Sequence, residues 1–233
     1  MLKNSVRALV AGIGFLGVFS LPVQTFAQAF NPPANTFAYG PAWQAVGPTA
    51  NQTGSYSATM TSGTIGAGLA AASPIYAFRY TGTGVAVVRR VIFSAGDLVG
   101  FAAGFVNLQL FAARAFTASD TGGTAATLTG NNAKLRTSFA TTGVGQIMIA
   151  NTGTNTPGTR TLDSTALGGL SVSVLTTAGA SVIAPTNLFG PFDAGLYPAA
   201  FANNEGFVIQ ATVPATGTWQ ATITVEWDEY AAY

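Results

Sequence analysis

The stretch Trp-Gln-Ala-Thr-Ile-Thr-Val-Glu-Trp, residues 219–227, decides the fold class. Apolar side chains occupy every odd position in it, and polar side chains occupy every even position. This period of two over nine residues is typical of an antiparallel strand with one buried face. The pattern predicts that the core contains Trp219, Ile223, Val225 and Trp227, together with Phe207 and Ile209 from an earlier strand, and that Gln220, Thr222 and Thr224 are more exposed.

Shorter versions of this pattern recur along the chain, separated by turns rich in Gly, Pro, Asn and Thr. They cover residues 74–81, 84–93, 106–111, 145–150, 170–175 and 206–213, and the second is expected to close at Gly96-Asp97. Eight or nine such strands predict an antiparallel β-sandwich or jelly roll with little helix. The best helical candidates, 67–72 and 131–135, are better read as a loop and a turn.

Residues 85–93 are apolar at nearly all positions, so both faces of this strand are apolar. A strand of an isolated sheet has one polar face. Two explanations fit: the strand is central in a sandwich, or its second face contacts another subunit. The second is favoured by the low overall charge, because the cores of subunit interfaces are depleted in charged residues.

The N-terminal part divides into two segments ahead of a β-sandwich domain at 55–233. In residues 1–29, Lys3 and Arg7 precede the apolar run 8–21, and Ala27-Gln28-Ala29 follows, which is the layout of a secretory signal peptide. The alternative is an apolar arm buried in an assembly. Residues 30–54 contain four prolines and no helical period, and they predict an extended arm.

The composition excludes much of enzyme chemistry. The 233 residues include no histidine and no cysteine, and only nine basic and eight acidic side chains. Histidine is the usual proton-transfer group near neutral pH, and cysteine is a ready nucleophile and zinc ligand. The formal net charge of +1 gives no strong attraction to nucleic acid or to an anionic membrane. We therefore expect no enzyme and assign no catalytic, cofactor-binding or metal-binding residue.

Asp120-Thr121-Gly122 has the spelling of an aspartic protease motif. That mechanism needs two carboxylates that share a proton, and the sequence contains no second Asp-Thr-Gly or Asp-Ser-Gly. A turn between strands is the better interpretation.

Glu226, Asp228 and Glu229 form an acidic cluster near the C-terminus. A solvated strand face is the favoured interpretation, and a cation bound at Glu226 and Asp228 is the alternative. Arg89 and Arg90 are adjacent on a strand, so one of them is expected to face inward and to need an acidic partner such as Glu226 or Asp228.

Two further short motifs favour structural interpretations. Lys134 and Arg136 lie in an Asn-rich loop that lacks the spacing of a phosphate-binding loop, and we expect this loop to be solvated or to hydrogen-bond a neighbouring subunit. Asn51-Gln52-Thr53 matches a glycosylation sequon, a match that occurs frequently by chance.

About three quarters of the chain resembles small, mostly uncharacterised proteins encoded by tailed bacteriophages and prophages. The resemblance is carried by YSATMTSGTIGAGLAAASPIYAFRY (56–80), RAFTASDTGGTAATLTGNNAKLRTSF (114–139), GTRTLD (158–163) and NEGFVIQATVPATGTWQATITVEWDEYAAY (204–233). It implies a structural role in the virion and supplies no catalytic residues. Residues 1–54 depart from the pattern, because phage particles assemble in the cytoplasm and their subunits need no signal peptide.

These observations predict a non-enzymatic structural subunit of a virion, either a capsid decoration protein or a component of a fibre or spike. Such a subunit would need no cofactor and would contact copies of itself, as a trimer or in a lattice, and other virion proteins. The alternative is an exported surface protein, an adhesin or a filament subunit, in which residues 30–54 are a donated strand. In either case we expect neither nucleic-acid binding nor a stable membrane span.

Overall fold

The computed structural model describes residues 51–70, 72–175, 181–190 and 198–231, without the side chains of residues 97, 98 and 181. All regular structure in these ranges is β-strand, as the sequence predicted. A search of the same ranges finds no helix with the length and apolar character needed to cross a membrane. The predicted signal segment 1–29 and residues 30–50 of the predicted arm lie outside the described residues.

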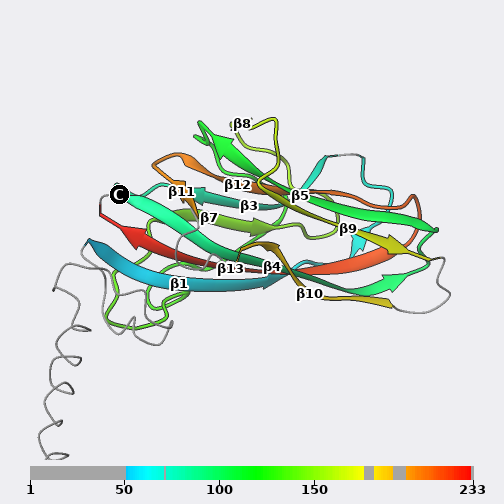
Figure 1. The fold of residues 1–233 in the computed structure, drawn as a ribbon, viewed down its shortest axis with the longest axis horizontal. Coiled ribbons are helices and arrows are strands. Elements are labelled where there is room, and N and C mark those ends of the chain that lie inside the picture. The colour runs from blue at the N-terminus through cyan, green and yellow to red at the C-terminus, as the bar shows by residue number, and fades with distance from the viewer. Residues whose placement is uncertain (1–50, 71, 176–180, 191–197, 232–233) are drawn as a thin grey trace, which may run out of the picture. The chain divides into compact units, whose positions relative to one another are not determined.

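Two antiparallel sheets pack face to face as a sandwich (Figure 1). The first sheet contains β1 (Gln52–Thr61), β2 (Ile65–Gly66), β4 (Val85–Val99), β10 (Ser181–Phe189), β11 (Ala199–Phe201) and β13 (Thr218–Tyr230). The second contains β3 (Ser73–Tyr80), β5 (Gly104–Arg114), β6 (Thr124–Ala125), β7 (Val144–Ile149), β8 (Thr161–Leu162), β9 (Gly168–Val174) and β12 (Glu205–Thr212). The predicted sandwich is therefore confirmed.

The order of the long strands is that of a jelly roll. The first sheet runs β1-β13-β4-β10, and the second contains β3-β12-β5 with β9 paired to β5. If these eight strands are counted along the chain, the sheets read 1-8-3-6 and 2-7-4-5. This is the nested Greek-key order in which successive strands alternate between the sheets, except that the fourth and fifth, β5 and β9, are neighbours in the second sheet. β7 is an addition to it, paired to the outer side of β3.

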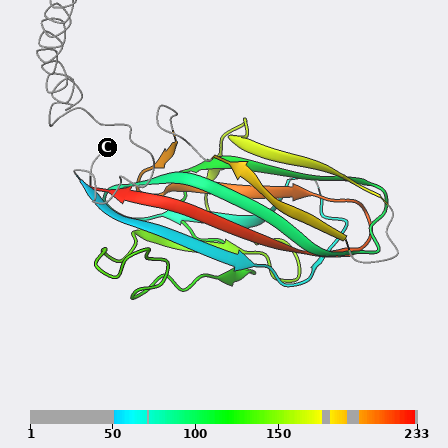
Figure 2. The same cartoon turned by 60° about the horizontal axis from the view of Figure 1, so that its bottom comes forward.

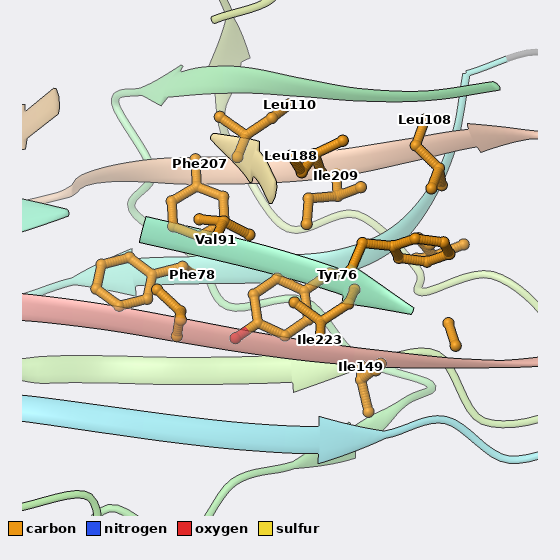
Figure 3. Packing of buried hydrophobic residues seen from close by; sticks show 14 of the residues in the cluster. Tyr76, Phe78, Val91, Leu108, Leu110, Ile149, Leu188, Phe207, Ile209 and Ile223 are labelled. Atoms are coloured by element: carbon orange, nitrogen blue, oxygen red, sulfur yellow. The ribbon is translucent and has the colours of Figure 1, made fainter. Parts of the chain in front are cut away.

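The core lies between the sheets and has the composition predicted from the last strand. Trp219, Ile223, Val225 and Trp227 of β13 are fully buried, and so are Phe207 and Ile209 of β12. Gln220, Thr222 and Thr224 point to the other face and are partly exposed. Figure 3 shows Ile223 and Val91 from one sheet meeting Tyr76, Phe78 and Phe207 from the other.

β4 is a central strand of the first sheet, and Val87 on its second face is buried within this chain. It pairs with β13 on one side and with β10 and β11 on the other. Ala86, Val87 and Val88 are all buried within this chain. Of the two explanations that the sequence left open, central placement is confirmed, and Val87 needs no neighbouring subunit to cover it.

Candidate functional site

Asp120 lies in the connection between β5 and β6, and its carboxylate is fully buried. Its Oδ1 forms an ion pair with Arg160, whose side chain is 4% exposed, and accepts a hydrogen bond from the Gly158 N–H at 2.9 Å. The backbone of Asp120 also exchanges two hydrogen bonds with the side-chain amide of Gln146, at 2.7 and 2.8 Å. These contacts hold the β5–β6 connection against the 158–160 loop and against β7.

Arg79 and Arg160 secure these loops over the outer face of the second sheet. Arg79 donates to the carbonyl oxygens of Phe116 and Thr117 and to the side chains of Ser119 and Asn204. The Arg160 guanidinium lies 5.0 Å from the centre of the Phe116 ring, a cation–π distance. Phe116 is the centre of a second small core with Ala77, Ala113 and Val208. Because Arg160 is distant in sequence from its partners, no spacing signal pointed to it.

The acidic cluster at the end of β13 is paired with arginines. Arg90 Nη2 lies 2.5 Å from Glu226, and Arg89 Nη1 lies 3.4 Å from Asp228. The partners proposed from the sequence are thus the residues that meet. A search of the described residues finds no group of three acidic or other metal-ligating side chains that could hold an ion. The solvated-face interpretation holds for Glu226, which is half-buried, and is wrong for Asp228 and Glu229, which are buried.

The expectation that Arg89 or Arg90 faces inward is wrong. Arg90 pairs with Glu226, whereas the next residue of β13, Trp227, pairs with Val88. Arg89 is therefore the extra residue of a β-bulge, which breaks the alternation of side chains. Both guanidinium groups reach the outer face, with side chains 55% and 35% exposed, and neither needs a partner in the core.

Glu229 joins the two sheets near the C-terminus of the chain. Its carboxylate accepts hydrogen bonds from the Thr142 hydroxyl, from the Gly143 N–H at 2.9 and 3.0 Å, and from the Trp227 indole N–H at 3.0 Å. Thr142 and Gly143 immediately precede β7 of the second sheet, and Glu229 belongs to the first. The Glu229 carboxylate therefore has a structural role, because it links β13 to the start of β7.

Burial raises the pKa of the three tyrosines in this core. Burial and then the negative charge of Glu229 raise the pKa of Tyr80 to about 12 and that of Tyr56 well above its ordinary value of 10. Burial alone raises the pKa of Tyr76. Between the unfolded value of 10 and the folded value, the unfolded chain binds fewer protons than the native protein, so the free energy of unfolding falls as pH rises.

We therefore expect the protein to lose stability progressively above about pH 10, near the pKa of an unperturbed tyrosine. Urea denaturation monitored by tryptophan fluorescence at pH 8, 9, 10 and 11 measures the effect. Absorbance at 295 nm should show that the tyrosinates appear together with unfolding. The Tyr80→Phe variant, which cannot ionise there, should have a shallower slope. Constant stability from pH 9 to 11 would contradict the assignment.

The Asn-rich loop covers part of the outer edge of β1. Ser57 N–H donates to the Ala133 carbonyl at 2.8 Å, and Leu135 N–H donates to the Ser55 carbonyl at 3.0 Å. The Lys134 side chain is within 3.4 Å of the Asn131 amide oxygen, and Arg136 is exposed. The loop therefore acts as a short added strand, made by this chain itself. Asn51 of the sequon lies at the turn before β1 and is also exposed.

Beyond this loop, no described strand pairs with the outer edge of β1, which lies beside a groove. The groove has a volume of about 330 Å³ and is lined by residues 57–60 of β1, by 126–128 and by 132–133, all uncharged. Figure 2 shows β1 along one border of the sandwich, with the 124–140 connection next to it. The sequence analysis placed no site here, because the segments that form the groove lie about 70 residues apart.

Among the described residues, the charged residues other than Asp97 lie toward one end of the sandwich. The opposite end, at the right in Figure 1, contains the turn from β4 to β5, the end of β9 and the start of β10. Its segments 61–70, 98–108, 170–175, 181–186 and 210–222 carry no charged residue. Asp97 of β4 is the exception at this end, between Gly96, which pairs with Gln220, and Leu98, which pairs with Ser181. Four of the six exposed large apolar side chains among the described residues lie there: Val99, Phe105, Leu175 and Val182, the last two 75% exposed. We call this region the uncharged end.

No protein-family model matches the chain, and a search of curated protein sequences finds no significant match.

Proposed function

We propose that the chain is a non-enzymatic structural subunit of a tailed-phage virion, a capsid decoration protein or a fibre or spike component, that assembles with copies of itself. The observation that carries the proposal is the uncharged end. Exposed apolar side chains gathered on a surface with few charges are typical of an interaction site. Charge is also what keeps small proteins apart in solution, and this end has almost none.

The fold and the resemblance support the same assignment. Jelly rolls occur in viral capsid proteins as well as in lectins and cupins, so the fold alone does not choose among them. The resemblance of 56–80, 114–139, 158–163 and 204–233 to phage-encoded proteins favours the virion. The chemistry-bearing residues add to this: Asp120, Glu226, Asp228 and Glu229 each bind structural partners.

The uncharged end makes a prediction about assembly. Phe105→Glu and Val182→Glu each place a charge on a side chain that is already exposed, so the fold should tolerate them, whereas an apolar interface should not. We expect the full chain to be a stable oligomer by light scattering and both variants to be smaller. Leu167→Glu, at an exposed apolar residue outside the uncharged end, is the matched control and should not change the size. A full chain that is monomeric at micromolar concentration would overturn the proposal.

A second candidate is an exported surface protein, and the N-terminal sequence favours it. Lys3 and Arg7 ahead of the apolar run 8–21 have the layout of a secretory signal. Mass spectrometry of the native protein separates the two candidates. A chain that begins at Met1 supports assembly in the cytoplasm, and one that begins at Gln28 or Phe30 supports export.

A further inference from the structure

We infer that the groove beside β1 receives residues 34–40 of a second copy of the chain as an added strand. This inference rests on the proposed self-assembly and names the site and the partner segment. Strand addition to an exposed sheet edge is a general mode of recognition, in which main-chain hydrogen bonds give affinity and pockets for alternate side chains give specificity.

The edge of β1 has backbone groups at two positions that no other described residue pairs with. Within a strand, the N–H and C=O groups of successive residues point to opposite sides. Ser55 and Ser57 point outward, where the 131–135 loop binds them, and Ser62, just after β1, points inward to Ala221. By the same alternation Thr59 and Thr61 point outward, past the end of that loop. A short strand can therefore pair there.

The groove next to this edge suits apolar side chains. Met60 and Leu128 line its two walls, and both are only partly buried although they pack against the main core. Its walls carry no charge, so an uncharged, apolar segment fits it without burying an unpaired group. An exposed open edge of this kind is otherwise a site of uncontrolled pairing, which natural proteins cover or block.

Residues 34–40 have the sequence that this site requires. The chain carries no charged residue between Arg7 and Arg79. Within the N-terminal 50 residues, Ala-Asn-Thr-Phe-Ala-Tyr-Gly lies between Pro33 and Pro41 and is itself free of proline. Thr, Phe and Tyr favour strands, and Phe37 and Tyr39, two residues apart, share one face of a strand. Proline at both ends limits pairing to a short segment, matching the short open edge.

The length of chain before β1 allows the segment to reach another copy. Residues 41–51 separate it from β1, and eleven extended residues span up to about 36 Å. The next proline-free window of the arm, 42–47, is separated from β1 by only residues 48–51, or about 14 Å. Within one copy, the 131–135 loop occupies the edge of β1 between its start and Thr59. An arm that arrives from a neighbouring copy can reach Thr59 and Thr61 without passing along the part of the edge that this loop occupies. Residues 34–40 also follow the predicted cleavage sites, so export would not remove them.

Disulfide trapping tests the inference directly, because the chain has no cysteine of its own. Full-length Thr59→Cys protein is mixed with proteins that carry one cysteine at position 35, 36, 37, 38 or 39, and the mixtures are oxidised. Residues opposite each other on paired antiparallel strands have Cα atoms about 4.5–5.5 Å apart, which is within the range that a disulfide bridges. We expect a band at twice the monomer mass of 23.6 kDa, with yields that alternate along the donor positions.

Two matched controls define specificity. Thr224→Cys places the acceptor one strand further from the edge, opposite Thr59 on β13, and should not cross-link to the donor. Donor cysteines at positions 43–46 should not cross-link to Thr59→Cys either. If either control cross-links in the same yield as Thr59→Cys with donors at positions 35–39, the cross-links report random collision and the inference is wrong.

The remaining outcomes separate this inference from the proposed function. If the full chain is oligomeric by light scattering but no donor position cross-links to Thr59→Cys, residues 34–40 do not occupy the groove and only the inference fails. If a chain carrying both cysteines cross-links within itself while the mixtures do not, the segment covers its own edge, and the inference is again wrong. If the full chain is monomeric, the proposed function fails as well.

Discussion

Replacing Trp227 by alanine should lower the free energy of unfolding by about 3–5 kcal/mol, the range for truncation of a buried tryptophan or phenylalanine. Trp227 is fully buried on β13. Its ring stacks on Tyr56 of β1 at 5.3 Å and meets the edge of Phe78 of β3 at 5.4 Å. The side chain therefore fills space between the two sheets, and its removal leaves a cavity that the rigid strands cannot close.

The same substitution also affects Glu229. The Trp227 indole donates a hydrogen bond to this buried carboxylate at 3.0 Å, and alanine removes that donor. Loss of a hydrogen bond to a charged group costs about 1.5–3 kcal/mol, which places the expected effect toward the upper part of the range. Trp227→Phe keeps most of the volume without the donor, so it should fall between the wild type and Trp227→Ala.

Urea denaturation measures the effect, and Thr224→Ala is the control. Thr224 lies on the same strand but faces outward, where its hydroxyl is 2.8 Å from that of Thr59. Its replacement should cost no more than about 1 kcal/mol, the ordinary net value of a hydrogen bond. If Trp227→Ala also cost less than about 1 kcal/mol, the register of β13 would be incorrect.

The fold could be predicted because its central strands have strong one-dimensional patterns. Residues 219–227 alternate because β13 has one face in the core and one outside it. β10, by contrast, escaped prediction because Pro185 interrupts it. β10 is an edge strand with shifts in register, and an edge is where a strand tolerates proline.

In β4, hydrogen bonding to strands on both sides outweighs the local turn signal at Gly96-Asp97. Gly96-Asp97 was expected to end the strand that begins at Val85, but β4 continues to Val99. Its neighbours β13 and β10 supply hydrogen-bond partners along this stretch, with Gly96 opposite Gln220. Glycine and aspartate disfavour strands only weakly compared with a complete set of ladder hydrogen bonds.

The sequence correctly indicated which acidic residues pair with the two arginines of β4, but it wrongly predicted that one arginine faces inward. Arg89 and Arg90 do meet Asp228 and Glu226, because β4 and β13 are neighbours. The bulge at Arg89 shifts the alternation of side chains between the two faces by one residue, and no residue type in the strand predicts a bulge there. The pairing of Asp120 with Arg160 depends on how two loops pack over Phe116, which is a tertiary property.

That buried pair carries the second large expected effect. Arg160→Met should lower the free energy of unfolding by about 3–5 kcal/mol, because it leaves the Asp120 charge buried without its partner. Both side chains are nearly inaccessible, at 4% and 0% exposure. Methionine retains much of the apolar stem that packs near Phe116, so the loss reports mainly on the charge. Denaturation in urea, followed by fluorescence, gives the value.

Arg114→Met is the matched control for this effect. Arg114 also forms ion pairs, with Glu205 at 2.9 Å and Asp163 at 3.4 Å, but its side chain is 45% exposed. Exposed ion pairs contribute about 0–1 kcal/mol, because water screens both partners and solvates whichever one is left alone. An Arg160→Met variant no less stable than Arg114→Met would mean that Asp120 has access to water in solution.

The double variant Asp120→Asn with Arg160→Met separates charge from packing. Asparagine keeps an oxygen that can accept the hydrogen bond of the Gly158 N–H, now 2.9 Å from Asp120 Oδ1, but it carries no charge. If the uncompensated carboxylate causes the loss, the double variant should be more stable than Arg160→Met alone, since removal of both charges also removes the cost of burying one. If the two are equally unstable, the guanidinium acts through its contact with the Phe116 ring, and the loop is held by packing rather than by charge.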